Sequence, residues 1–141
     1  MTGLVIVDAA NVVGSVPDGW WRDRAGATAR LLETLNALPG NGLPPVSGVP
    51  EWALGPVEVV LVVEGKASRV AATGAVRVVA ARGSGDDAIV DLVRAEQRPC
   101  LVVTADRGLR ERVLALGAAV TGPSTVRPDA GRGAATGPTG R

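Results

Sequence analysis

The chain has 141 residues and a formal net charge of +1, with 21% charged and 2% aromatic residues. This length suits one domain with a sheet covered on both faces, and the balanced charge excludes a general attraction to nucleic acid, so RNA binding would need a local patch. No apolar run approaches the roughly 20 residues that span a bilayer, and the apolar N-terminus has no basic leader. We therefore expect a soluble, cytoplasmic protein without a membrane partner.

The first third of the chain predicts a strand, a helix and a long loop. Leu4–Asp8 is an apolar, strand-like run, and residues 22–38 carry apolar side chains at helical spacing, with Pro39-Gly40 expected to end the helix. Residues 39–56 are rich in Gly and Pro and predict a loop. Trp20-Trp21-Arg22 could stack a base or pack at the helix start, and the scarcity of aromatic residues favours packing.

The rest of the chain alternates strands and helices. Residues 123–141 are rich in Gly, Pro and Arg with almost no apolar bulk, so we expect a domain over 1–122 and a disordered tail. The βαβ order predicts an α/β fold with a mostly parallel central sheet of about five strands and helices on both faces. The expected strands are 57–63, 75–80, 100–104 and 118–121, and the expected helices are 86–97 and 107–116.

Acidic side chains stand where the predicted strands end or the following helices begin. Parallel strands bring their carboxyl ends to one edge of a sheet, where open α/β folds bind ligands. Two carboxylates about 4 Å apart repel by about 4 kcal/mol at an effective dielectric near 20, so such a cluster favours a divalent cation. Oxygen ligands suit Mg²⁺ or Mn²⁺, and the chain has no histidine to bind zinc. The acids are Asp8, Glu64, Asp86, Asp87 and Asp106.

Each acid also has a purely structural interpretation. Asp8 could be satisfied by backbone N–H groups of its own turn, expected at Ala9-Ala10-Asn11. Helix capping accounts for Asp87, whereas helical phase turns Asp86 towards the sheet and favours it as a ligand. Asp106 fits the N-cap of the next helix equally well. We rank Glu64 third among the metal-binding positions.

Polar residues beside the acids are candidates for binding substrate. Lys66 and Arg69 lie in a loop after a strand-end acid and could hold a phosphate or pair with that acid. Asn11 could orient Asp8 or donate to a phosphate, although Asn is also common in turns. The hydroxyl of Thr104 could reach a metal-bound water, and a cationic side chain follows Asp106. The complete set is Asn11, Lys66, Arg69, Thr104 and Arg107.

The order and spacing of these motifs form a recognisable pattern. It consists of Asp8-x-x-Asn11, Glu64, Gly85-Asp86-Asp87-Ala88-Ile89, Thr104-Ala105-Asp106-Arg107 and Leu116-Gly117-Ala118. Over about residues 3–122 the chain thereby resembles the NYN branch of the PIN-like nuclease superfamily. It departs from that pattern at Ala9, where a glycine is usual, and at Glu64, where Asp is frequent.

The resemblance implies a Rossmann-like PIN fold and a Mg²⁺- or Mn²⁺-dependent ribonuclease. Asp8, Asp86 and Asp106 would be the catalytic residues and would hold one or two metals, with Glu64 and Asp87 as further candidate ligands. RNA is the implied substrate, and a homodimer is compatible with the sequence.

Other functions stay open beside a ribonuclease. A nucleoside triphosphate pyrophosphohydrolase would also use acids and Mg²⁺, although only Asp87 and Asp91 approach the Glu-x-x-Glu spacing of the helical types. A non-catalytic PIN-like module that binds RNA or protein agrees with the near-neutral charge and with Ala9. A receiver-like or haloacid-dehalogenase-like domain is disfavoured, because Asp8-Ala9-Ala10 lacks a second acid two residues on.

Overall fold

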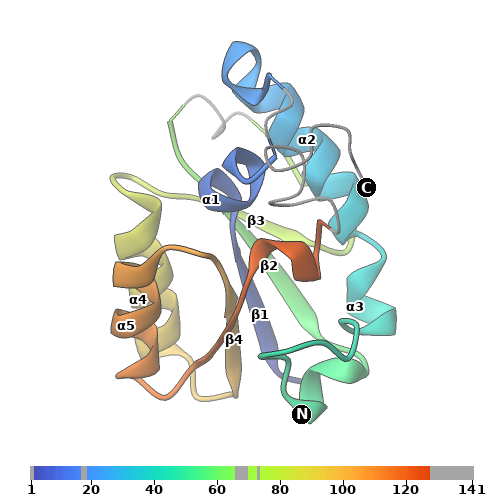
Figure 1. Ribbon diagram of the computed structural model, residues 1–141, viewed down its shortest axis with the longest axis vertical. Helices are drawn as coiled ribbons and strands as arrows, with labels where there is room; N and C mark the ends of the chain where they lie inside the picture. Colours follow the sequence, from blue (N-terminus) through green and yellow to red (C-terminus); the bar gives the residue numbers. More distant parts are fainter. Residues whose placement is uncertain (1, 17–18, 66–69, 73, 128–141) are drawn as a thin grey trace, which may run out of the picture.

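A five-stranded, all-parallel sheet forms the centre of the protein (Figure 1). The structure is a computed structural model and describes residues 2–16, 19–65, 70–72 and 74–127. The strands follow the order β3-β2-β1-β4-β5, which confirms the expected α/β class. They are β1 (Leu4–Asp8), β2 (Glu58–Val63), β3 (Arg77–Ala80), β4 (Cys100–Val103) and β5 (Ala119–Thr121), each within two residues of its expected bounds.

Helices cover both faces of the sheet (Figure 1). One face carries α4 (Gly85–Ala95) and α5 (Arg107–Leu114), and the other carries α1 (Ala9–Gly14), α2 (Arg24–Leu35) and α3 (Leu38–Asn41). Three short 3₁₀ helices complete the described part of the chain: η1 (Trp20–Arg22), η2 (Glu51–Leu54) and η4 (Pro123–Thr125). In that part of the chain, no helix is long and apolar enough to cross a membrane.

Strand alternation divides the core into two layers. Val5 and Val7 of β1 pack with α1 and α2, whereas Leu4 and Ile6 pack with α4 and α5. All four side chains are almost completely buried, and each contributes roughly 2 kcal/mol of burial free energy. A central parallel strand with both faces covered therefore reads as an unbroken apolar run.

The segment after β1 differs from the expectation. Residues 9–11 were expected to form a turn, but they begin α1, because the Asp8 carboxylate caps this helix and its apolar residues are buried. The expected helix over 22–38 is divided into η1 and α2, and α2 ends at Leu35. Pro39 and Gly40 lie inside α3 and do not end a helix, since proline is tolerated in a first turn.

The packed part of the chain extends beyond the expected boundary at residue 122. Pro123–Thr125 form η4, and Val126 is 4% exposed in the core layer beneath α1 and α2. The Thr125 hydroxyl lies 2.8 Å from that of Thr121 in a buried hydrogen bond, which ties this segment to β5. The remainder of the expected tail, residues 128–141, lies outside the described residues.

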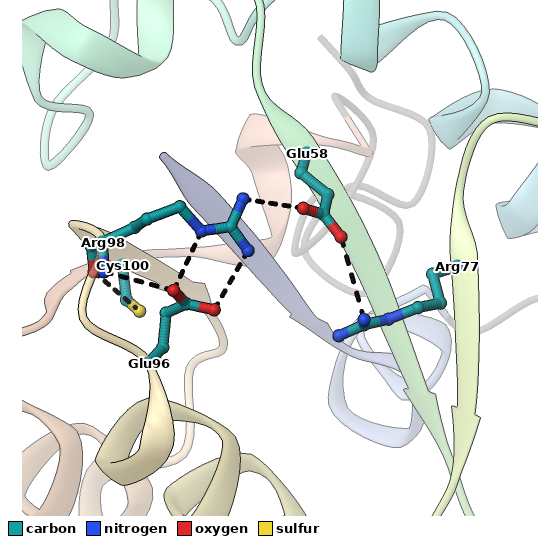
Figure 2. A network of polar contacts seen from close by, with 5 residues as sticks. All are labelled: Glu58, Arg77, Glu96, Arg98 and Cys100. Carbon is teal, nitrogen blue, oxygen red and sulfur yellow. Dashed lines mark hydrogen bonds and ion pairs between the residues drawn. The ribbon is translucent and has the colours of Figure 1, made fainter. Parts of the chain in front are cut away.

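An ion-pair network joins the amino ends of the strands (Figure 2). Arg98, just before β4, donates to the two carboxylate oxygens of Glu96 at 2.9 and 3.0 Å and to Glu58 at 2.7 Å. Glu58 begins β2, and its second oxygen lies 3.9 Å from Arg77 at the start of β3. The hydrogen bonds from Arg98 lower the pKa of Glu96 to about 2. Because β1 lies between β2 and β4, the network spans four adjacent strands.

Removal of the Arg98 guanidinium should destabilise the fold. Arg98→Ala leaves two partly buried carboxylates without their shared cation, so we expect the free energy of unfolding in urea at pH 7 to fall by about 1–3 kcal/mol. Arg94→Ala is the matched control, because Arg94 pairs with Asp91 at 3.4 Å between two exposed side chains. That variant should change stability by less than about 0.5 kcal/mol. Equal losses in the two variants would contradict a structural role for the network.

Candidate functional site

Asp8 ends the central strand at the point where the order of the strands reverses. The chain runs outward from β1 through β2 to β3 and then returns to place β4 on the other side of β1. Ligands of open α/β sheets bind outside the carboxyl ends of the strands at such a switch point. Val7 pairs in register with Val103, so the next residue on each strand, Asp8 and Thr104, are also neighbours.

A buried hydrogen bond fixes the Asp8 carboxylate. The Thr104 hydroxyl donates to Asp8 Oδ2 at 2.9 Å, and the Asn11 N–H donates to Oδ1 at 3.4 Å. Thr104 Oγ1 also accepts the N–H of Asp106 at 3.1 Å. Asp8 is 4% exposed and Thr104 0% exposed. Thr104 therefore positions Asp8 and the start of α5, and its hydroxyl proton is directed to Asp8.

The pKa values indicate that the acids share one electrostatic environment. Burial raises the pKa of Asp8 to about 6, its two hydrogen bonds oppose this rise, and the charges of Asp86 and Glu64 add to it. The pKa of Asp86 is also raised, first by burial and then by the charges of Asp106 and Glu64. The charges of Asp8, Glu64, Asp86 and Asp106 thus act on one another near the end of β1, and we refer to these four residues as the acidic crevice.

The two neighbouring acids at the start of α4 point in different directions. Asp87 is exposed, and its carboxylate lies 3.0 Å from Arg112 Nη2 on α5. Its N–H is capped by the Ser84 hydroxyl at 3.2 Å, as the capping interpretation expected. Asp86 is half-buried and is the member of the pair whose pKa responds to the crevice. Asp87 is therefore the less suitable metal ligand.

Glu64 and Asp106 each make a backbone contact that places them at the rim of the acidic crevice. Asp106 is the N-cap of α5, and its Oδ1 accepts the N–H of Leu109 at 2.9 Å. Glu64 follows β2, and its Oε2 accepts the N–H of Gly85 at 2.9 Å, which ties β2 to the first turn of α4. A Cβ on Gly85 would lie 2.5 Å from that oxygen, so glycine permits the contact.

The expected substrate-binding residues do not all lie in the same place. Asn11 Oδ1 accepts the N–H of Ala105 at 2.8 Å and joins α1 to the loop before α5. Arg107, the first residue of α5, is exposed at the rim of the acidic crevice. Lys66 and Arg69 lie outside the described residues.

Sequence reasoning missed two arginines beside the acidic crevice. Arg110 Nε donates to the backbone oxygen of Thr104 at 2.7 Å and supports the end of β4. Its position one helical turn after Asp106 is the signal that could have identified it. Arg24, on α2, lines a small cavity together with Trp20 and Glu64. Nothing in the local sequence links Arg24 to Glu64, because the cavity brings together residues 40 positions apart in the chain.

The acidic crevice supplies only oxygen ligands. Within the described ranges, no group of three or more Asp, Glu, Cys or His side chains is placed to hold a metal ion together. Mg²⁺ often takes only one or two protein carboxylates and completes its octahedral shell with water. The residues present therefore fit a hydrated Mg²⁺ or Mn²⁺ bound partly through water, and they do not fit a fully dehydrated ion.

Comparison with known proteins supports the fold. No protein-family model matches the chain, and no curated protein matches it. Among solved structures, the chain is similar to Rae1 (YacP) from Bacillus subtilis, with a TM-score of 0.65 and 16% identity over 91% of this chain and 74% of that chain. At this level of identity the likeness establishes the fold alone, and it confirms the expected Rossmann-like PIN fold.

The buried carboxylate of Asp8 should make stability depend on pH. Between its ordinary value of 3.8 and its folded value of about 6, the folded state retains a proton that the unfolded state has lost. Raising the pH through this window therefore lowers the free energy of unfolding, by up to about 3 kcal/mol from Asp8. Asp8→Asn removes this pH-dependent loss of stability and keeps a side-chain oxygen that can accept the Thr104 hydrogen bond. The variant should gain stability relative to the wild type between pH 4 and pH 7, without added metal.

Urea denaturation across that pH range measures the effect. Asp91→Asn is the control, because it makes the same substitution at a carboxylate whose side chain is 76% exposed. A difference between Asp8→Asn and wild type that stays constant from pH 4 to pH 7 would show that Asp8 is not a strained carboxylate.

Proposed function

We propose that this chain is a metal-dependent ribonuclease of the NYN type, which hydrolyses phosphodiester bonds of RNA at the acidic crevice. The observation that carries the proposal is that the charges of Asp86 and Glu64 act on the buried Asp8, and that of Asp106 on Asp86, at the switch point of a PIN-like sheet. Burial and mutual repulsion destabilise the ionised carboxylates, and this cost is better explained by a ligand than by folding.

A cation would allow the anionic substrate to approach. Asp8, Asp86 and Asp106 would hold a hydrated Mg²⁺ or Mn²⁺ partly through its water ligands, with Glu64 beside them. When bound, the cation supplies a Lewis acid and neutralises charge at the phosphate. Helices α4 and α5 also begin at the acidic crevice, and their positive N-terminal ends favour an anion there.

The protein's own side chains orient the reacting groups. The Thr104 hydroxyl donates to Asp8 Oδ2, which prevents the carboxylate from rotating, and Asp8 is ionised above about pH 6. Asp86 is half-buried and has a raised pKa, so its carboxylate is suited to accept a proton from the attacking water. The exposed Arg107 and the amide nitrogen of Asn11 are placed at the rim to donate to phosphates of the RNA backbone.

The alternatives have weaker support in the described residues. A pyrophosphohydrolase would use Asp87 and Asp91, but both are exposed and each pairs with an arginine on the helix surface. A non-catalytic module is favoured by one observation, the absence among the described residues of a three-acid metal group. The assay below separates the three functions.

Asp86→Asn should abolish metal-dependent cleavage of RNA. We expect the wild type to cleave unstructured RNA in Mn²⁺ and to stop when the metal is chelated. The cleavage rate of the variant should be lower by roughly 100-fold or more. Mn²⁺ should raise the melting temperature of the wild type and should do so less in the variant, because one ligand is missing. RNA cleavage is followed by gel electrophoresis and melting by fluorescence.

Asp87→Asn is the matched control for this experiment. It removes one negative charge from the adjacent residue, whose carboxylate is exposed and paired with Arg112, and it should retain activity close to that of the wild type. Release of pyrophosphate from nucleoside triphosphates without RNA cleavage would favour the pyrophosphohydrolase. Absence of both activities, with RNA or protein binding retained, would favour the non-catalytic module.

Gly85→Ala should displace Glu64 without unfolding the protein. The added methyl group would meet Glu64 Oε2, and the flexible Glu64 side chain can turn away from it. The melting temperature should change little, because alanine favours the helix, whereas RNA cleavage should fall by about 10-fold as a rim carboxylate leaves its position. Gly83→Ala is the control, since its Cβ would enter open space. Unchanged cleavage in Gly85→Ala would remove Glu64 from the site.

A further inference from the structure

The two tryptophans of η1 have different environments. Trp20 is half-buried and packs against the core, and its ring lies near Gly14 at the end of α1. Trp21 is 56% exposed. The third tryptophan of the chain, Trp52, also packs against the core. The packing interpretation of the Trp-Trp-Arg motif therefore holds for Trp20 and leaves Trp21 unexplained, in a protein that has no other aromatic residues.

Trp21 is held in a defined orientation. Its ring is nearly perpendicular to that of Trp20, at 86°, with 6.0 Å between the ring centroids. The Arg22 guanidinium carbon lies 5.8 Å from the centre of the Trp21 ring. An edge-to-face contact on one side and a cation on another fix the indole while more than half of the residue stays accessible. Together, Trp21 and Arg22 form an exposed aromatic and cationic surface, which we call the Trp21 platform.

The Trp21 platform adjoins the acidic crevice. Trp20, which supports Trp21, lines the same small cavity as Arg24 and Glu64. Glu64 in turn contacts the first turn of α4 beside Asp86. In Figure 1, the chain enters α2 at the top of the view, above α1. Trp20 therefore links the platform to the cavity that Glu64 lines.

We propose that the Trp21 platform stacks an unpaired base of the RNA that reaches the acidic crevice. This inference rests on the proposed ribonuclease function. Stacking on an exposed indole needs a base whose face is free, and the bases of an A-form duplex are stacked on one another. Arg22 adds local positive charge towards the RNA backbone in a protein whose net charge is only +1.

Binding measured in the absence of cleavage tests this proposal. The full chain carrying Asp86→Asn is titrated with fluorescent oligouridine, with an RNA duplex of equal length and with an abasic oligonucleotide of equal charge. We expect oligouridine to bind most tightly. Trp21→Ala should weaken oligouridine binding by about 10-fold and leave abasic binding unchanged, and Trp21→Phe should restore part of the loss because phenylalanine also stacks. Leu114→Ala, at an apolar residue 51% exposed on α5, is the control and should bind like the parent.

Several outcomes would overturn the proposal. Equal binding of duplex and oligouridine, or an equal loss for abasic and base-bearing strands in Trp21→Ala, would exclude stacking. Dissociation of a homodimer in Trp21→Ala, detected by sedimentation at unchanged RNA affinity, would assign the platform to a contact between copies of the chain. If the wild type cleaves RNA but Trp21→Ala keeps the full preference for single strands, base stacking by Trp21 is overturned. The ribonuclease function is not overturned by that result. A wild type that neither binds nor cleaves RNA would overturn the ribonuclease function as well.

Discussion

The hydrogen bond from Thr104 to Asp8 is the contact on which the arrangement of the site depends. It crosses from β4 to β1 at the switch point of the sheet, and it is almost completely shielded from water. The same hydroxyl accepts the first N–H before α5, so one side chain sets both the carboxylate and the start of a helix. A buried hydroxyl has a single proton to donate, and this one is given to the acid. The geometry of the acidic crevice therefore follows from the parallel register of β1 and β4.

Two opposite physical demands meet at Asp8. Burial favours the protonated carboxyl, whereas the hydrogen bonds from Thr104 and Asn11 favour the ionised form, and burial dominates. The neighbouring acids add repulsion that the fold does not relieve. A structural N-cap would satisfy only part of this balance, because the cap bond to Asn11 is long at 3.4 Å. The energetic cost of burying the ionised Asp8 carboxylate is explained if this carboxylate binds a cation.

Much of the fold could be predicted from the sequence, because the decisive signals were local. The strands are runs of three to six mostly apolar residues, and Ser84 and Asp106 mark helix starts by capping. The short helix α1 was missed, since its six residues carry too little periodic pattern and its cap, Asp8, was interpreted as a strand end. The acids were found because they stand where predicted strands end or helices begin, and parallel strands bring their carboxyl ends to one edge of the sheet. The contacts of Arg24 and the exposure of Trp21 depend on tertiary packing, which no local pattern records.

The ion-pair network at the amino ends of the strands has a mechanical consequence. Arg98 and Glu58 fasten β2 and β4 on either side of β1 at the edge opposite the acids. Strands held in this way cannot slide past one another. A change in strand register therefore cannot bring the acids together around an ion. The adjustment is left to side chains and to the first turns of α4 and α5. The sheet thus acts as a fixed frame, and adaptability is confined to a thin layer of groups at its far end.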